Sequence, residues 1–298
     1  MVSIRFGMVG AGFWATDVHL PILSKHAGVE LVGVWDRNPA KADTVAARFG
    51  ARGFPRYEAM LDAVDAVSIA VPPGVQPDFA IPAARAGKHL MLEKPIAFRS
   101  DVARTVVAEV ETAGVAAVVF FTRRYIPEIV AAMPGLLADG PWTAGRACFH
   151  TGAMVSDTPY ATSSWRQQKG VLWDLGPHAV SVLLPVLGPV REACAVSFAS
   201  GVIEFQLRHE SGARSTASLT FHAAPADRAE VYEFSGGGRT RRVGVAPASR
   251  QPCFVAALDS LLEAVVRPGM EAPACSVQFG SEVVRILSEA EQSLARAN

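Results

Sequence analysis

The chain has 298 residues, of which 50% are hydrophobic and 19% are charged. This composition supports a large buried core and excludes a disordered polymer, and the length predicts two domains. The 28 Lys and Arg residues balance the 28 Asp and Glu residues. No basic field therefore points to nucleic acid or to an anionic membrane surface as a partner.

The first 121 residues predict a regular alternation of strands and helices. Apolar runs that predict strands lie at 4–10, 30–35, 66–71, 89–92 and 115–121. Helical spacing lies between them at 13–25, 40–49, 57–61, 79–86 and 101–113. Such crossovers between buried strands are typical of an α/β fold, with a doubly wound parallel sheet of the Rossmann type.

From Arg124 onward the pattern changes to alternating strands. Segments 202–209 and 215–221 flank Glu210-Ser211-Gly212, and segments 230–234 and 241–245 flank a glycine-rich stretch at 235–238. Both connections predict hairpins, since no helix follows the second one to make it a phosphate loop. Helices are predicted at 254–266 and 277–295. We therefore expect domains at 1–121 and 122–298, the second an α+β domain with an open, mainly antiparallel sheet.

The cysteines and apolar runs point to a reduced compartment and no membrane. Cys148, Cys194, Cys253 and Cys275 show no metal-ligand spacing, so we expect free thiols, no metal site and a cytoplasmic location. The run 115–121 is far shorter than the ~20 residues of a membrane helix. The first fifteen residues lack a signal-peptide cleavage site, so we expect no signal peptide.

The first predicted strand ends in Gly10-Ala11-Gly12-Phe13-Trp14-Ala15, a G-x-G-x-x-A segment that opens a helix. Backbone N–H groups and the helix dipole hold a pyrophosphate in this setting. Asp36 follows 21 positions after Ala15, where a carboxylate that binds the ribose 2′-OH is expected. Asp36 favours NAD, whereas the adjacent Arg37 leaves NADP open. The alternative is a glycine turn followed by an unrelated acid.

Glu93-Lys94-Pro95 ends the strand predicted at 89–92, at the edge where open α/β sheets bind their ligands. A residue before proline is kept out of helical geometry, which restricts the direction of Lys94. The alternative is a lysine on a surface turn.

Asp174 and His178 lie four positions apart. We expect their helix to start near Asp174, because Pro177 fits only a first helical turn. On one helix face, the Asp can fix the tautomer of a His that transfers protons. The alternative is an N-terminal cap and a core histidine.

These segments resemble, in their order along nearly the whole chain, the glucose-fructose oxidoreductase, inositol dehydrogenase and rhizopine catabolism family (Gfo/Idh/MocA). The resemblance rests on residues 10–15, His19-Leu20-Pro21, Asp36, residues 86–95, Thr122-Arg123-Arg124-Tyr125, Trp165-Arg166 and residues 170–178. It implies a Rossmann domain, a second domain with an open antiparallel sheet, and NAD(P)-dependent oxidation or reduction of sugars and cyclitols.

The resemblance also implies roles for single residues. Lys94 binds the reacting oxygen, His178 is the acid/base, and Asp174 orients His178 or holds a neighbouring hydroxyl. Cofactor contacts are implied for Gly10, Gly12, Phe13, Trp14, Ala15, Asp36, Arg37, Val71, Pro72, Gln76, Glu93 and Lys94. Tyr125, Trp165 and Arg166 would contact the substrate, with packing roles as the alternative. A homodimer or homotetramer is expected through an apolar open sheet face.

Three departures from the family pattern bear on function. Gln76 and Pro73 stand where the family more often has His and Asn, Ser181 stands where it often has Asp, and the chain is short. The loss of a carboxylate at Ser181 argues against inositol itself as the substrate. The alternatives to a sugar or cyclitol dehydrogenase are an NAD-dependent glycoside hydrolase that uses transient oxidation, and a noncatalytic cofactor-binding sensor or scaffold.

Overall fold

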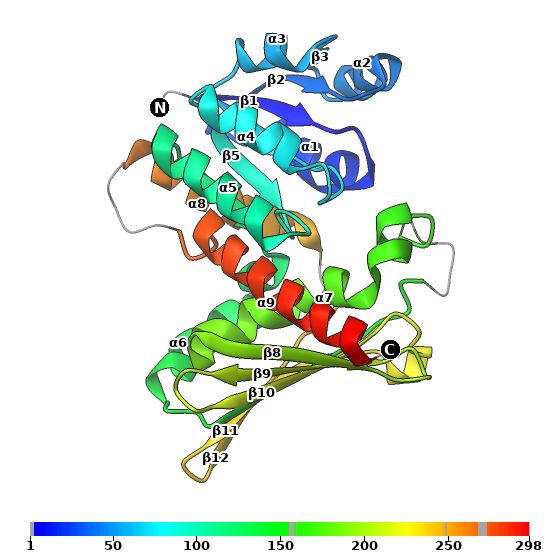
Figure 1. Ribbon diagram of the computed structural model, residues 1–298. Helices are drawn as coiled ribbons and strands as arrows, with labels where there is room; N and C mark the ends of the chain where they lie inside the picture. The colour runs from blue at the N-terminus through cyan, green and yellow to red at the C-terminus, as the bar shows by residue number, and fades with distance from the viewer. Residues whose placement is uncertain (1–2, 155–157, 159, 248, 268–272, 298) are drawn as a thin grey trace. The chain divides into compact units, whose positions relative to one another are not determined.

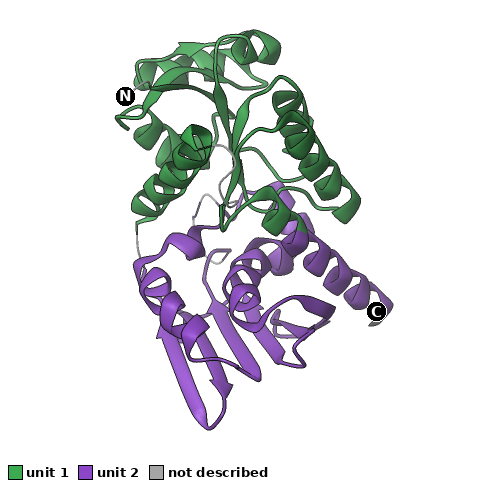
Figure 2. Ribbon diagram, turned by 90° about the vertical axis from the view of Figure 1, so that its left-hand side faces the viewer, with its two compact units in different colours: residues 1–120, 249–281 green, residues 121–248, 282–298 purple. Residues whose placement is uncertain are grey.

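The computed structural model (Figure 1) describes residues 3–154, 158, 160–247, 249–267 and 273–297. Two compact units form, Met1–Phe120 with Ser249–Ser281 and Phe121–Ala248 with Glu282–Asn298 (Figure 2). The predicted division lies one residue from this boundary but placed Ser249–Ser281 in the second domain. Residues 1–2 and 298, at the ends of the predicted domains, lie outside the described residues.

The first unit contains the predicted parallel sheet, with strand order β3-β2-β1-β4-β5-β6. β1, β4, β5 and β6 are buried along nearly their whole lengths, which explains their continuous apolar runs. The strands are β1 (Ile4–Val9), β2 (Val29–Trp35), β3 (Arg52–Gly53), β4 (Ala66–Ile69), β5 (His89–Glu93) and β6 (Ala117–Phe120).

The helices of this unit are η1 (Ala15–His19, a π-helical turn), α1 (Leu20–Leu23), α2 (Pro39–Arg48), α3 (Tyr57–Leu61), α4 (Pro77–Arg85), α5 (Ser100–Ala113) and α8 (Arg250–Val266). α8 belongs here because Phe254 packs on the rings of His19 and Phe120, with centroids 4.2 and 5.2 Å apart. This contact joins segments that are far apart in the sequence, which sequence periodicity does not reveal.

The second unit contains a six-stranded sheet in the order β12-β11-β7-β10-β9-β8. β7 and β10 are parallel and the other pairs are antiparallel, which includes both predicted hairpins, β9–β10 and β11–β12. The strands are β7 (Ala144–His150), β8 (Val190–Ser197), β9 (Ile203–His209), β10 (Arg214–Thr220), β11 (Ala229–Gly236) and β12 (Arg239–Gly244).

The remaining elements are η2 (Thr122–Tyr125), α6 (Pro127–Ala138), α7 (Ser164–Leu187), η3 (Pro225–Asp227) and α9 (Val277–Ala297), which begins in the first unit and continues into the second. One sheet face is buried beside α7, through residues such as Ala147, Phe149 and Leu219. The core of the second unit lies between this face and the helix.

The opposite face of this sheet is polar, not apolar as expected. Residues at the alternate positions of β7, β8, β9 and β10 include the exposed Arg146, Cys194, Gln206 and Thr216. Glu233 lies opposite Arg146 on β11. Because neighbouring charged and polar side chains are solvated, this face needs no apolar cover. An apolar sheet face therefore no longer supports the expected homodimer or homotetramer, which stays a prediction.

α7 differs from its predicted start near Asp174. The helix begins at Ser164, is interrupted at Gly170, where φ is +70° and ψ is −168°, and contains Pro177 well inside its second part. Among the described residues, α7 is the one helix that is both long enough and apolar enough to cross a membrane. However, 83% of its most apolar 18-residue stretch is buried inside the protein. This burial is typical of a core helix.

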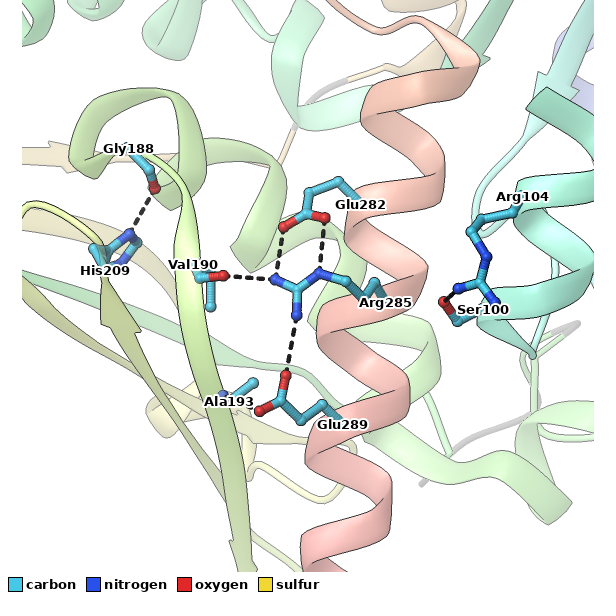
Figure 3. Close-up of polar contacts among 9 residues, drawn as sticks. All are labelled: Ser100, Arg104, Gly188, Val190, Ala193, His209, Glu282, Arg285 and Glu289. Carbon is cyan, nitrogen blue, oxygen red and sulfur yellow. Dashed lines mark hydrogen bonds and ion pairs between the residues drawn. The ribbon is translucent and has the colours of Figure 1, made fainter. Parts of the chain in front are cut away.

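The outer edge of β8 is covered by side chains from α9, as Figure 3 shows around Arg285. The Arg285 guanidinium donates to Glu282, to Glu289 and, at 2.6 Å, to the carbonyl of Val190. Glu289 in turn accepts from the N–H of Ala193 at 3.2 Å. Ser293 accepts from the N–H of Ala195 at 2.8 Å. The helix thus satisfies edge groups that no further strand pairs.

Candidate active site

The glycine-rich segment follows β1 directly. Gly10 has a φ of +98°, and a Cβ there would lie 2.7 Å from the carbonyl oxygen of Ala70, so a side chain is excluded by the protein itself. A Cβ on Gly12 would meet nothing within 4 Å. The chain itself therefore leaves open space at Gly12, and the G-x-G-x-x-A pattern predicts that a pyrophosphate approaches the backbone there. Ala15 is fully buried.

Asp36 ties this segment to the second strand. Its Oδ2 accepts from the N–H of Ala11 at 2.9 Å, and its Oδ1 accepts from the N–H of Asn38 at 2.9 Å. Both bonds hold the carboxylate at the carboxyl edge of the sheet, and each carboxylate oxygen has capacity for a further hydroxyl donor. Arg37 is exposed. The arrangement fits a ribose diol better than a 2′-phosphate, because the fixed negative charge repels the latter.

Four other residues predicted to contact the cofactor follow these strands. Phe13 is 36% exposed, and Trp14 is half-buried with its ring edge-on to that of Phe13. Val71 is half-buried, Pro72 is exposed, and both follow β4. The strand registers Val9–Trp35, Val9–Ile69 and Ile69–Leu92 align the carboxyl ends, so these residues share one edge with Asp36 and Lys94.

Gln76 holds the turn that carries Lys94. Its Nε2 donates to the carbonyls of Glu93, at 2.7 Å, and Pro95, at 3.2 Å, and its Oε1 accepts from the N–H of Glu93 at 2.9 Å. Gln76 is fully buried, and the Lys94–Pro95 peptide is cis. These hydrogen bonds give Gln76 a positional role in the turn that carries Lys94, and its predicted cofactor contact stays a prediction.

His19 holds the side chain of Glu93 in this turn. The ring is fully buried, its Nε2 donates to Glu93 Oε1 at 2.9 Å, and its Nδ1 shares a hydrogen bond of 2.8 Å with Ser68 Oγ. The other Glu93 oxygen accepts from the N–H of Lys94 at 3.2 Å. Sequence analysis placed His19 in a family-like segment but gave it no role. Lys94 itself is 7% exposed.

In the second unit, the break at Gly170 turns Arg166 back toward Asp174. The guanidinium Nε donates to Asp174 Oδ2 at 3.0 Å, in an ion pair whose partners are both buried. The guanidinium also stacks on the rings of Trp165 and Tyr160, with its carbon 4.3 and 4.9 Å from their centroids. Asp174 is therefore the partner of Arg166 in an ion pair. Its spacing to His178 in the sequence did not predict this partner.

His178 lies one helical turn after Asp174 and is 6% exposed. Its ring centroid is 5.8 Å from that of Phe149, whose other neighbour is the guanidinium of Arg123 at 4.6 Å. Arg123 forms a bidentate pair with Glu230, with N–O distances of 2.9 and 2.8 Å. Sequence analysis singled out Tyr125 from this segment. Tyr125 and Arg123 are both half-buried in η2, and it is Arg123 that contacts Phe149, the ring packed against His178.

The phenol of Tyr232 joins the Arg123–Glu230 ion pair. Tyr232 donates to Glu230 Oε1 at 3.1 Å. Burial raises the pKa of Tyr232 well above its ordinary value, and the charge of Glu230 adds to this effect. Burial alone would lower the pKa of Arg123, but the hydrogen bonds and charge of Glu230 raise it. Arg123 is therefore a permanent cation, and Tyr232 a neutral hydroxyl, throughout the physiological pH range.

Across the described ranges, no group of three or more His, Cys, Asp or Glu could hold a metal ion.

Comparisons with known proteins agree with this architecture. Residues 4–121 match the model of an oxidoreductase family with an NAD-binding Rossmann fold (GFO_IDH_MocA). The 4-carboxy-2-hydroxymuconate-6-semialdehyde dehydrogenase of Sphingobium sp. is 30% identical over 74% of this chain and 72% of its own length. The dTDP-3,4-didehydro-2,6-dideoxy-alpha-D-glucose 3-reductase of Streptomyces antibioticus is 27% identical over 84% of this chain and 79% of its own.

Another relative is longer. The uncharacterized protein YMR315W of Saccharomyces cerevisiae is 29% identical over 72% of this chain, which spans 62% of its length. Among solved structures, GenD2 from gentamicin A biosynthesis, in complex with NAD, shows a TM-score of 0.85 at 22% identity, covering 100% of this chain and 96% of its own. The fold is therefore shared over the whole chain, and the protein belongs to the Gfo/Idh/MocA family of NAD(P)-dependent oxidoreductases.

Proposed function

We propose that the protein transfers a hydride between NAD and a secondary alcohol, or the matching ketone, of a sugar or sugar derivative. The observation that carries this proposal is the fixed Glu93-Lys94-Pro95 turn at the carboxyl edge of the NAD-binding sheet. Gln76 and the Glu93 carboxylate hold its backbone, and His19 holds the Glu93 carboxylate in turn. The substrate class is supported by the relative from Streptomyces antibioticus, a reductase of a dTDP-linked keto sugar.

In the proposed reaction, Lys94 binds the reacting oxygen and its ammonium stabilises the negative charge that develops there. His178 takes the hydroxyl proton as the hydride leaves the same carbon, and returns it in the reductive direction. When bound, the nicotinamide accepts or supplies the hydride. The oxidation therefore yields the ketone, the reduced cofactor and one proton on His178, so that electrons and protons balance.

Asp174 and Arg166 act together in this proposal. Their ion pair fixes the carboxylate and guanidinium one turn before His178. The planar guanidinium suits several hydroxyls or an acidic group on the substrate. We assign the pair to substrate binding, alongside Tyr125 and Trp165, and the proton transfer to His178.

The Asp36 contacts support NAD as the preferred cofactor. The carboxylate already accepts from two backbone N–H groups and is held in place, so a 2′-phosphate would meet a fixed negative charge. NADH and NADPH titrations, followed by energy transfer from tryptophan, test this point. Tighter binding of NADPH would assign the exposed Arg37, not Asp36, as the residue that selects the cofactor.

The semialdehyde dehydrogenase from Sphingobium sp. favours a second candidate substrate class. An aldehyde that carries a hydroxyl as well as carboxylates, as the name of this relative states, can close to a cyclic hemiacetal. The CH–OH group of that ring is oxidised to the lactone by the same transfer of hydride and proton. The permanent cation of Arg166 suits such carboxylates. A substrate panel of nucleotide sugars, free sugars, cyclitols and carboxylated semialdehydes separates the two classes by the rate of NAD⁺ reduction.

The decisive variant is Lys94→Met, with Lys41→Met on the exposed surface of α2 as the matched control. We expect Lys94→Met to lose at least about 100-fold in turnover with the best substrate, because the charge at the reacting oxygen is lost. Binding of NADH and the thermal midpoint should stay near those of the wild type. Turnover equal to that of Lys41→Met would refute the assignment of Lys94.

A further inference from the structure

The N-terminus of α8 lies on the helix that begins at the glycine-rich segment. Gln251, in the first turn of α8, donates from Nε2 to the carbonyl of Asp17 at 3.0 Å. One turn later, Phe254 packs on His19, at the end of the same π-helical turn. These two contacts fix the start of α8 against residues 13–19, within the first unit. Residues far apart in the sequence thus come together beside the pyrophosphate-binding loop.

Arg250 is the first residue of α8, and its guanidinium lies on Trp14. The guanidinium carbon is 5.2 Å from the centroid of the Trp14 ring, within the range of a cation–π contact. Both side chains are half-buried. Trp14 is the fifth residue of the G-x-G-x-x-A segment, so its ring places a cation on the segment whose pattern predicts pyrophosphate binding.

We propose that Arg250 binds the pyrophosphate of the cofactor and that Trp14 is the platform that holds its guanidinium in place. Gly12 opens the loop to the phosphates, because nothing lies within 4 Å of the position of its missing Cβ. A guanidinium ordered on an aromatic face loses little freedom when it forms bidentate hydrogen bonds with phosphate oxygens. The inference rests on the proposed use of NAD and adds a residue outside the 4–121 segment that the family model matches.

The alternative role of Arg250 is purely structural. In that case the contact with Trp14 secures α8, and its loss weakens every ligand of the first unit to the same extent or lowers stability without changing binding. A phosphate contact acts differently, because it weakens only ligands that carry the pyrophosphate. The two roles are therefore separated by comparing ligands and not by stability alone.

The test measures dissociation constants of NADH, ADP-ribose and adenosine for the wild type, Arg250→Gln, Arg250→Lys and Arg267→Gln. Arg267 is the control, since it follows the other end of α8 and pairs with the exposed Glu263. NADH binding is followed by tryptophan energy transfer, and the other two ligands by displacement of NADH. Circular dichroism and thermal midpoints verify that the variants fold.

We expect Arg250→Gln to weaken NADH and ADP-ribose about tenfold, which corresponds to about 1.4 kcal/mol, and to leave adenosine within about twofold. Arg250→Lys should recover part of the loss, and Arg267→Gln should match the wild type. Unchanged NADH binding in Arg250→Gln, or an equal loss for adenosine, overturns the proposal. A wild type that binds neither NADH nor ADP-ribose would instead refute the use of NAD together with it.

Discussion

Replacement of His19 by leucine tests whether the turn at Lys94 depends on a buried polar partner. The His19 ring is fully buried, and the substitution removes its hydrogen bonds to Glu93, at 2.9 Å, and to Ser68, at 2.8 Å. Leucine fills much of the same space beside Phe254, so the loss of packing is small. Removing the donor to a buried carboxylate oxygen costs about 3 kcal/mol, because Glu93 Oε1 then loses the hydrogen bond that replaces its contact with water. We expect the free energy of unfolding to fall by that amount.

The assay is urea denaturation followed by circular dichroism, with His19→Gln as the matched control. The glutamine amide reaches toward Glu93 as Nε2 of the ring does, so this variant should lose only about 1–2 kcal/mol. The slope of free energy against urea should stay unchanged in both variants. A loss below about 1 kcal/mol for His19→Leu, or equal losses for the two variants, would refute the reasoning that Glu93 needs a donor at this position.

Two further predictions concern the first unit. Gly10→Ala should lower the free energy of unfolding by about 1–3 kcal/mol, because its φ is +98° and the Cβ meets the Ala70 carbonyl. Gly12→Ala should leave urea stability unchanged and weaken NADH binding, and the reverse pattern in the two variants would contradict the assigned roles. Burial lowers the pKa of His89 in the folded protein, although the charge of Asp65 opposes this effect. In the unfolded chain His89 has its ordinary pKa of about 6.5, so the unfolded chain takes up a proton first as the pH falls. Stability should therefore decrease from about pH 7 to 5, and less so in His89→Asn, as urea midpoints at each pH would show. An undiminished decrease in that variant would exclude His89 as a source.

Most of the first sheet was predictable because β1, β4, β5 and β6 are largely apolar runs between turn residues. The two-residue β3 carries no such signal and was not predicted. The second sheet was predicted only where a glycine-containing hairpin joins two strands. β7 alternates small residues, with Gly145 and Ala147 facing the core, so its periodicity is weak. β8 alternates in the same way through Ala193 and Ala195. α6 was missed because it carries Pro134 and is apolar on exposed positions such as Leu137.

The candidate site was predictable where a residue follows a strand or a glycine turn. Gly10, Asp36 and Lys94 are of this kind, because the parallel sheet brings the carboxyl ends of the strands that precede them to one edge. Contacts over long separations were not predictable. The pairs His19–Glu93 and Arg123–Glu230 join residues 74 and 107 positions apart. Arg166 reaches Asp174 only because the helix breaks at Gly170, a conformation that helical periodicity does not signal.

The side chains of α9 that cover β8 have a consequence for how the chain can be shortened. β8 is the last strand of its sheet, and the carbonyl of Val190 accepts from Arg285 (Figure 3). The N–H groups of Ala193 and Ala195 donate to Glu289 and Ser293. A protein cut before Glu282 would present these groups as a bare strand, a template for β-pairing with another chain. Loss of the last helix would therefore favour aggregation, because α9 shields an edge that would otherwise recruit further strands.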